Sequence, residues 1–118
     1  GDYSSVRPIY MNLCDKQCDC NTRGVQVLNS SRIEELIQEV ENWEVIDSHH
    51  LKKEYRFPSY LDGVQFAVRL AAIAEEQNHH PSIILNYRRV VVEIYTHVVN
   101  GLTDNDFILA AKYDQLGK

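Results

Sequence analysis

The stretch RRVVVEIYTHVVNGLTDNDFILAA, residues 88–111, decides the fold because it holds a strand, a turn and a helix in direct succession. Its first half alternates between two sets of side chains, the pattern of a β-strand with one face buried. One set comprises Val90, Val92, Ile94 and Thr96, and the other comprises Val91, Glu93, Tyr95 and His97. We therefore expect the most strongly patterned strand of the chain here.

The second half of this stretch predicts the last helix. Asn100 and Gly101 mark a turn. Thr103, followed three residues later by Asp106, fits a capping box, in which each residue bonds the backbone N–H of the other. The helix then continues with Phe107, Ile108, Ala110 and Ala111.

A helix and a hairpin are predicted nearer the N-terminus. Residues 29–43, NSSRIEELIQEVENW, predict a helix whose capping box pairs Ser31 with Glu34. Residues 43–57, WEVIDSHHLKKEYRF, alternate on either side of DSHH and predict a β-hairpin. We expect solvated histidines at its turn, His49 and His50.

The second predicted helix covers residues 62–78, DGVQFAVRLAAIAEEQN, with Asp62 as its cap. Pro81 disfavours helical geometry at the residue before it, so this helix should stop near His79. Residues 82–89 hold either another short strand or the beginning of the long one, and the pattern leaves both open. The order of elements predicts an α+β domain, with an antiparallel sheet covered by helices.

The composition excludes several classes of function. At 118 residues with a formal charge of -5, the chain fits one domain with no general attraction to nucleic acid or to an anionic membrane surface. No apolar run approaches the roughly 20 residues of a membrane span, and the N-terminus lacks the pattern of a secretion signal. We expect a soluble, cytoplasmic protein without direct contact to nucleic acid or membrane.

Residues 1–25 show neither helical nor strand periodicity and predict a flexible tail before a folded domain at residues 26–118. Met11 is the only methionine, and we expect it to be the natural start, with GDYSSVRPIY as an added leader. A zinc site among the cysteines of this tail would lack its fourth ligand. We interpret them as reduced thiols: Cys14, Cys18 and Cys20.

Two adjacent histidines, His79 and His80, stand at the predicted end of the second helix. Glu75 lies one helical turn before His79, close enough to pair with its ring. Imidazole can act as a general acid or base near neutral pH, and His97 could join the pair if its strand runs under the helix end. Two other interpretations stay open: a solvated helix cap, and a zinc site of three histidines without HExxH spacing. We predict no bound metal.

The spacing of these residues resembles the signature of the pterin-4a-carbinolamine dehydratases. The motif consists of Glu75, three residues, His79-His80-Pro81, five residues, Tyr87, nine residues, His97, eight residues and Asp106. The surrounding NHHP, THVVNGLTDNDFILA and YRFPSYLDGVQF are also similar to the family in order and spacing. The likeness covers about residue 33 to the C-terminus. Ile83 departs from the family, because many members carry a tryptophan there.

This resemblance implies an enzyme without metal or organic cofactor. It would dehydrate 4a-hydroxytetrahydrobiopterin to quinonoid dihydrobiopterin and so recycle the pterin used by aromatic amino acid hydroxylases. The resemblance implies the following roles. The catalytic histidines would be His79, His97 and His80; the supporting carboxylates would be Glu75 and Asp106; the residues that bind substrate would be His80, Pro81, Ile83 and Thr96.

The family fold implied by the resemblance is α-β-β-α-β-β-α, a four-stranded antiparallel sheet with helices on one face. It favours two strands between Ser82 and Val99. Members form homodimers or homotetramers, partly by joining sheets, and residues 51–57 are our candidate edge strand. Mammalian relatives are also dimerisation cofactors of a homeodomain transcription factor. That role is the alternative function: a binding module, nuclear as well as cytoplasmic, with a protein partner.

Overall fold

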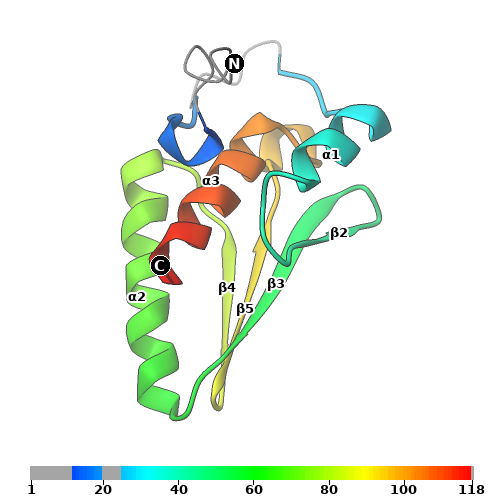
Figure 1. The fold of residues 1–118 in the computed structure, drawn as a ribbon. Coiled ribbons are helices and arrows are strands. Elements are labelled where there is room, and N and C mark those ends of the chain that lie inside the picture. The colour runs from blue at the N-terminus through cyan, green and yellow to red at the C-terminus, as the bar shows by residue number, and fades with distance from the viewer. Residues whose placement is uncertain (1–11, 20–24, 118) are drawn as a thin grey trace, which may run out of the picture.

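The computed structural model describes residues 12–19 and 25–117. Its helices and its twisted sheet are shown in Figure 1. The helices are α1 (Ser30–Ile37), α2 (Tyr60–Gln77) and α3 (Asp104–Asp114). The strands are β2 (Glu44–Ile46), β3 (His50–Arg56), β4 (Ser82–Asn86) and β5 (Arg89–Ile94). Short 3-10 turns are η2 (Leu13–Asp15), η3 (His97–Val99) and η4 (Gln115–Gly117). The α-β-β-α-β-β-α order is confirmed, and residues 82–89 do hold a separate strand.

The four strands form one antiparallel sheet in the order β2-β3-β5-β4. The prediction that residues 51–57 form an edge strand is only partly correct. β2 pairs with the first three residues of β3, His50–Lys52, whereas Lys53–Arg56 pair with β5 and have no strand partner on their other side among the described residues. A hairpin pattern predicts that β2 pairs with β3. It does not predict that β5 is the second partner of β3, because β5 lies almost forty residues later in the chain. The edges of the described sheet are β2 and β4.

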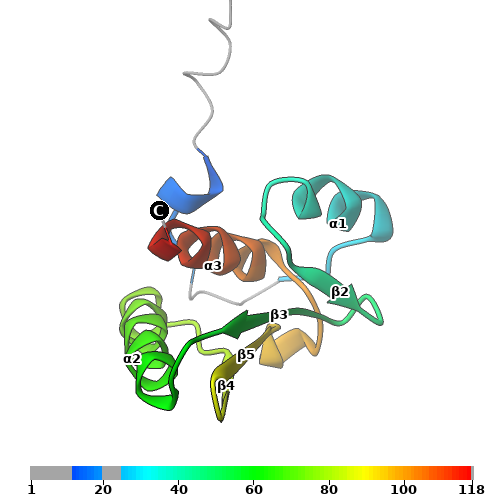
Figure 2. The same ribbon diagram turned by 60° about the horizontal axis from the view of Figure 1, so that its bottom comes forward.

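The helices lie on one side of the sheet (Figure 2). The strand residues that face them are fully buried: Leu51, Val90, Val92 and Ile94. Leu70 of α2 and Phe107 of α3 complete this core with no exposed surface. The alternation predicted for the long strand is therefore confirmed, since its even-numbered side chains Val90, Val92 and Ile94 face the helices and have no exposed surface.

Two of the three predicted helix caps are wrong by two or three residues. Asn29, and not Ser31, caps α1, because its side-chain oxygen accepts the Arg32 N–H at 2.9 Å. Ser59, and not Asp62, caps α2, since Ser59 Oγ accepts the Asp62 N–H at 3.1 Å. In both helices the cap is a polar residue that lies earlier in the chain and has extended backbone geometry. Because several polar residues lie close together there, the sequence pattern does not identify which of them is the cap.

The first helix also ends earlier than the predicted residue 43, at Ile37. The chain then turns so that Val40 and Trp43 both reach the core. The indole Nε1 of Trp43 donates to Asp114 Oδ1 at 2.9 Å, and Lys53 Nζ reaches the same carboxylate oxygen at 3.1 Å. Tertiary contacts to α3 therefore replace the last turns of the expected helix.

The N-terminal segment packs on the domain where we expected a separate tail. Leu13 is buried, Lys112 Nζ donates to the Cys14 carbonyl at 2.8 Å, and the buried Gln77 accepts the Cys18 N–H at 2.8 Å. Residues 12–19 thus belong to the folded unit, whereas the predicted leader and Cys20 lie outside the described residues. No described helix is long and apolar enough to cross a membrane.

Candidate active site

A histidine and a buried carboxylate form the centre of the site. His79 Nε2 lies 2.6 Å from Asp106 Oδ1, and the side chains are 12% and 0% exposed. Asn78, in the left-handed conformation at φ 52, ends α2 one residue before His79. The backbone N–H of His79 still bonds to the Ala74 carbonyl at 3.1 Å. The abrupt helix end therefore turns the imidazole out of the helix and towards α3.

Two donors besides His79 hold Asp106 in place. Its Oδ2 accepts the Thr103 backbone N–H at 2.8 Å, which confirms the predicted capping box, and the Thr96 hydroxyl at 2.9 Å. Thr96 Oγ1 also lies 2.7 Å from Thr103 Oγ1. Because the Thr96 proton goes to the carboxylate, Thr103 must donate to Thr96. This network fixes Asp106 as an acceptor for His79.

The second histidine has a different carboxylate. His80 Nε2 lies 2.5 Å from Glu75 Oε2, and both side chains are largely exposed. The expected pairing of Glu75 with His79 is wrong, because that spacing requires the helix to continue through His79. Since α2 ends at Gln77 and the chain turns at Asn78, the ring that returns over Glu75 is that of His80.

His97 is linked to the Asp106 network by its position next to Thr96 in the chain and not by a hydrogen bond of its own side chain. It follows Thr96, whose hydroxyl binds Asp106, and it begins η3 with an exposed side chain. Its ring centroid lies 4.3 Å from that of Tyr95. Direct hydrogen bonds between His97 and His79 or His80 are absent from the structure. The structure therefore links His97 to the His79–Asp106 pair through the neighbouring Thr96 and not through a contact of its own ring.

Tyr95 is also packed against a turn histidine. The centroid of His49 lies 4.4 Å from that of Tyr95, and His49 Nε2 lies 2.9 Å from Asn100 Oδ1. His49 Nδ1 lies 3.0 Å from His50 Nδ1. The prediction of solvated loop histidines is wrong, because both rings are half-buried and hydrogen-bonded. The β2–β3 turn folds over the end of β5, which a pattern confined to the hairpin cannot reveal.

The remaining predicted substrate contacts differ in accessibility. Pro81 is half-buried next to His80. Ile83 pairs with Val92 across β4 and β5 and packs on the hydrophobic core. Thr96 is 4% exposed, and its hydroxyl is engaged by Asp106 and Thr103. In this structure, Thr96 orients the carboxylate.

The thiols of the described cysteines form no part of the hydrogen-bond network between His79, Asp106, Thr96 and Thr103. Burial raises the pKa of the Cys18 thiol to about 11, an effect that Lys112 opposes and Asp106 adds to. Cys18 is therefore a thiol at neutral pH and a poor nucleophile. Within residues 12–19 and 25–117, no group of three histidine, cysteine, aspartate or glutamate side chains is arranged to hold a metal ion.

Sequence reasoning missed two features that bear on the site. Tyr95 and His97 share one side of the strand alternation, so their proximity could have been read from the period of two. Asn is common in the left-handed position that ends helices, so Asn78 could have been recognised as the end of α2. Neither pattern predicts that His49 packs on Tyr95, because His49 belongs to a different hairpin.

Comparison with known proteins identifies relatives of this chain. The sequence profile described as pterin 4 alpha carbinolamine dehydratase matches residues 26–116. A Rickettsia bellii protein provisionally named pterin-4-alpha-carbinolamine dehydratase is 43% identical over 92% of this chain and 96% of its own. A Rubrobacter xylanophilus protein with the same provisional name is 39% identical over 88% and 97%, respectively. The crystal structure of a transcriptional coactivator/pterin dehydratase from Brucella melitensis superposes with a TM-score of 0.72, at 27% identity, over 78% of this chain and 99% of that one.

Proposed function

Because this chain belongs to the pterin-4-alpha-carbinolamine dehydratase family, we propose that it dehydrates 4a-hydroxytetrahydrobiopterin to quinonoid dihydrobiopterin by histidine general acid–base catalysis. The observation that carries this proposal is the His79–Asp106 pair, with a bond of 2.6 Å between a partly accessible imidazole and a fully buried carboxylate. An aspartate in this position fixes the orientation and the tautomer of a histidine that moves protons.

The pair leaves one nitrogen of His79 for the substrate. Asp106 is an acceptor, so Nε2 of His79 carries the hydrogen between them. Nδ1 has no hydrogen-bond partner in the part of the chain that the structure describes. A neutral His79 can therefore accept a proton at Nδ1, and its imidazolium form can donate one from the same atom.

The reaction needs both kinds of proton transfer. The carbon–oxygen bond at the carbinolamine carbon breaks, and the departing hydroxyl takes a proton to leave as water. A second proton leaves the adjacent ring nitrogen, whose electron pair forms the new carbon–nitrogen double bond. In our proposal His79 and His97 divide these two transfers. His80, fixed by Glu75 at 2.5 Å, binds and orients the pterin.

Pterin binding tests this proposal without requiring turnover. We expect that a dihydropterin added to the protein shifts the imidazole NMR resonances of His79, His80 and His97 in a saturable manner. The rings of His49 and His50 should shift less, because their recorded contacts are to Tyr95, Asn100 and each other and not to the three site histidines. Unchanged resonances for the first three histidines would count against a pterin site here.

Tyr95 provides a test of how His97 is positioned. Replacing Tyr95 by Ala removes the ring against which His97 packs at 4.3 Å, so kcat should fall by about tenfold because a misplaced acid–base group transfers protons poorly. Tyr95→Phe keeps the ring and should retain most of the activity. Steady-state rates for both variants, with circular dichroism to verify the fold, check this expectation. Equal loss in both variants would assign the effect to the hydroxyl and not to the ring contact.

One observation favours a second function. The Brucella melitensis relative is described as a transcriptional coactivator as well as a pterin dehydratase. In that case this chain would be a protein-binding module, and replacement of His79 or His97 would leave partner binding unchanged. If the chain is a dehydratase, the same replacements should instead abolish turnover. The two variants therefore distinguish catalysis from partner binding.

A further inference from the structure

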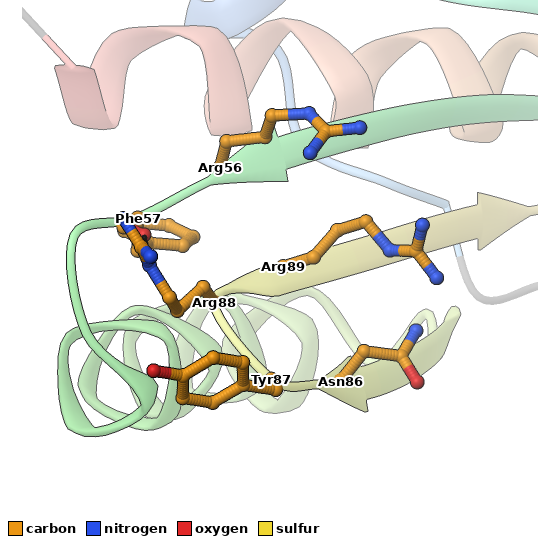
Figure 3. A pocket seen from close by; sticks show the side chains of 6 residues that line it. All are labelled: Arg56, Phe57, Asn86, Tyr87, Arg88 and Arg89. Carbon is orange, nitrogen blue, oxygen red and sulfur yellow. Dashed lines mark hydrogen bonds between the residues drawn. The ribbon is translucent and has the colours of Figure 1, made fainter.

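A recess lined by arginines lies at the opposite end of the sheet from the histidines. It measures about 630 Å³ and is lined by Arg56, Phe57, Asn86, Tyr87, Arg88 and Arg89 (Figure 3). His80 and Pro81 precede the first residue of β4, whereas Asn86 ends that strand. The length of β4 therefore separates the recess from the proposed pterin site, and its lining contains three cations and no carboxylate.

Two of the arginines directly oppose each other in the sheet. Arg56 of β3 and Arg89 of β5 are register partners, and Asn86 of β4 is the partner of Arg89 on the other side. The three side chains extend in the same direction across the three strands (Figure 3). Like charges directly opposite each other destabilise a sheet. The pairing of two arginines across the strands therefore lowers the stability of the sheet locally, and the fold itself does not require this pair.

Among the described residues, only part of this repulsion is compensated. Glu54 Oε2 lies 2.6 Å from an Arg56 nitrogen, and Glu54 Oε1 lies 3.9 Å from Arg89. One carboxylate therefore serves two guanidinium groups. Arg89 Nε is also a buried donor without an acceptor among the described residues.

Arg88 adds a second local cost. It occupies the β4–β5 turn at φ 59, a conformation for which turns prefer Gly or Asn. Its Nε donates to the Phe57 carbonyl at 3.3 Å, and its guanidinium lies 5.9 Å from the centre of the Tyr87 ring. No carboxylate of the described chain lies within ion-pair distance of it. The turn thus presents an uncompensated cation where the backbone would favour a smaller residue.

We propose that this recess binds a small anionic molecule through a phosphate or carboxylate group, with Arg56, Arg88 and Arg89 as its cationic contacts. The planar fork of guanidinium matches both groups and can bind them in a bidentate manner. The chain as a whole carries a net charge of -5, so this cluster is not a consequence of general basicity. A bound anion would offset the repulsion between Arg56 and Arg89 that Glu54 offsets only in part.

An NMR titration tests the proposal and distinguishes the two anion chemistries. The probes are inorganic pyrophosphate and, separately, citrate, each added at constant ionic strength maintained with sodium chloride. We expect saturable shifts of the Nε–H resonances of Arg88 and Arg89 with at least one probe, and the tighter probe identifies the anion class. Shifts that grow linearly with both probes would overturn the proposal, because they report only general ionic effects.

Variants assign the binding to these residues. Arg56→Gln together with Arg89→Gln should weaken binding by about tenfold or more, since each lost charge-assisted hydrogen bond is worth roughly that factor. Arg69→Gln is the matched control, because Arg69 is an exposed arginine of α2 that bonds to the Leu116 carbonyl. Equal affinity in the double variant and the control would overturn the proposal.

A second variant keeps the test decisive if the double variant fails to fold. Arg88→Asn removes the guanidinium but retains a residue suited to positive φ. We expect a folded protein with weaker pyrophosphate or citrate binding and unchanged dehydration of the pterin. Unchanged anion affinity in a folded Arg88→Asn protein would refute the role of Arg88 and with it the proposed site.

Discussion

The Asp106→Ala variant is expected to lose about 3 kcal/mol in free energy of unfolding together with most of its dehydratase activity. Asp106 has no exposed surface, and its carboxylate accepts from His79, Thr96 and the Thr103 backbone. Removing it leaves buried donors without partners, which costs about 1–3 kcal/mol for each group that water cannot reach. Denaturant unfolding gives the stability, and steady-state kinetics give the activity.

Asp104→Asn is the matched control for this variant. Asp104 lies in the same first turn of α3 but is exposed. Its replacement should change the free energy of unfolding by less than about 1 kcal/mol, which is the usual size of the interaction between a carboxylate and a helix N-terminus. If Asp106→Ala were no less stable than Asp104→Asn, the network around the carboxylate would not support the site as we describe it.

The His97→Ala variant is expected to lose activity without losing stability. His97 is exposed, and its described contact is the Tyr95 ring, so truncation should change the free energy of unfolding by about 0.5 kcal/mol or less. If His97 donates or accepts one of the two protons, kcat should fall by about 10²–10⁴-fold. Denaturation curves that coincide with the wild type, combined with this loss, would separate a catalytic role from a structural one.

The sequence predicts the elements better than the contacts between them. The alternation around Val92 and the Thr103–Asp106 capping box both appear in the structure, because each depends on residues close together in the chain. The first residue of a helix is harder to predict from the sequence, since neighbouring polar residues such as Asn29 and Ser31 are equally suitable as caps. Local physics therefore locates a helix but not always its first residue.

The pairing of the site residues required the tertiary structure. Helical spacing predicted Glu75 beside His79, but Asn78 ends the helix one residue too early for that pair. His79 instead meets Asp106, 27 residues away, and Glu75 meets His80. The residue types of the site were predictable, whereas the assignment of each carboxylate to its histidine depends on how α2 and α3 pack.

The turn histidines show the same limit. His49 is close in sequence only to other polar turn residues, which predicts solvent exposure. The sheet brings that turn to Tyr95 and Asn100, which follow β5 in the chain. The long separation along the chain explains why no local pattern reveals this contact.

The most direct test of the central claim is the rate at which 4a-hydroxytetrahydropterin decays, generated in situ by a hydroxylase and followed by ultraviolet absorbance. We expect the wild-type protein to accelerate the decay in proportion to its concentration, and folded His97→Ala to have little effect beyond the buffer rate. If decay with the wild-type protein equals decay in buffer, the chain is not a dehydratase and the histidine site must serve another function.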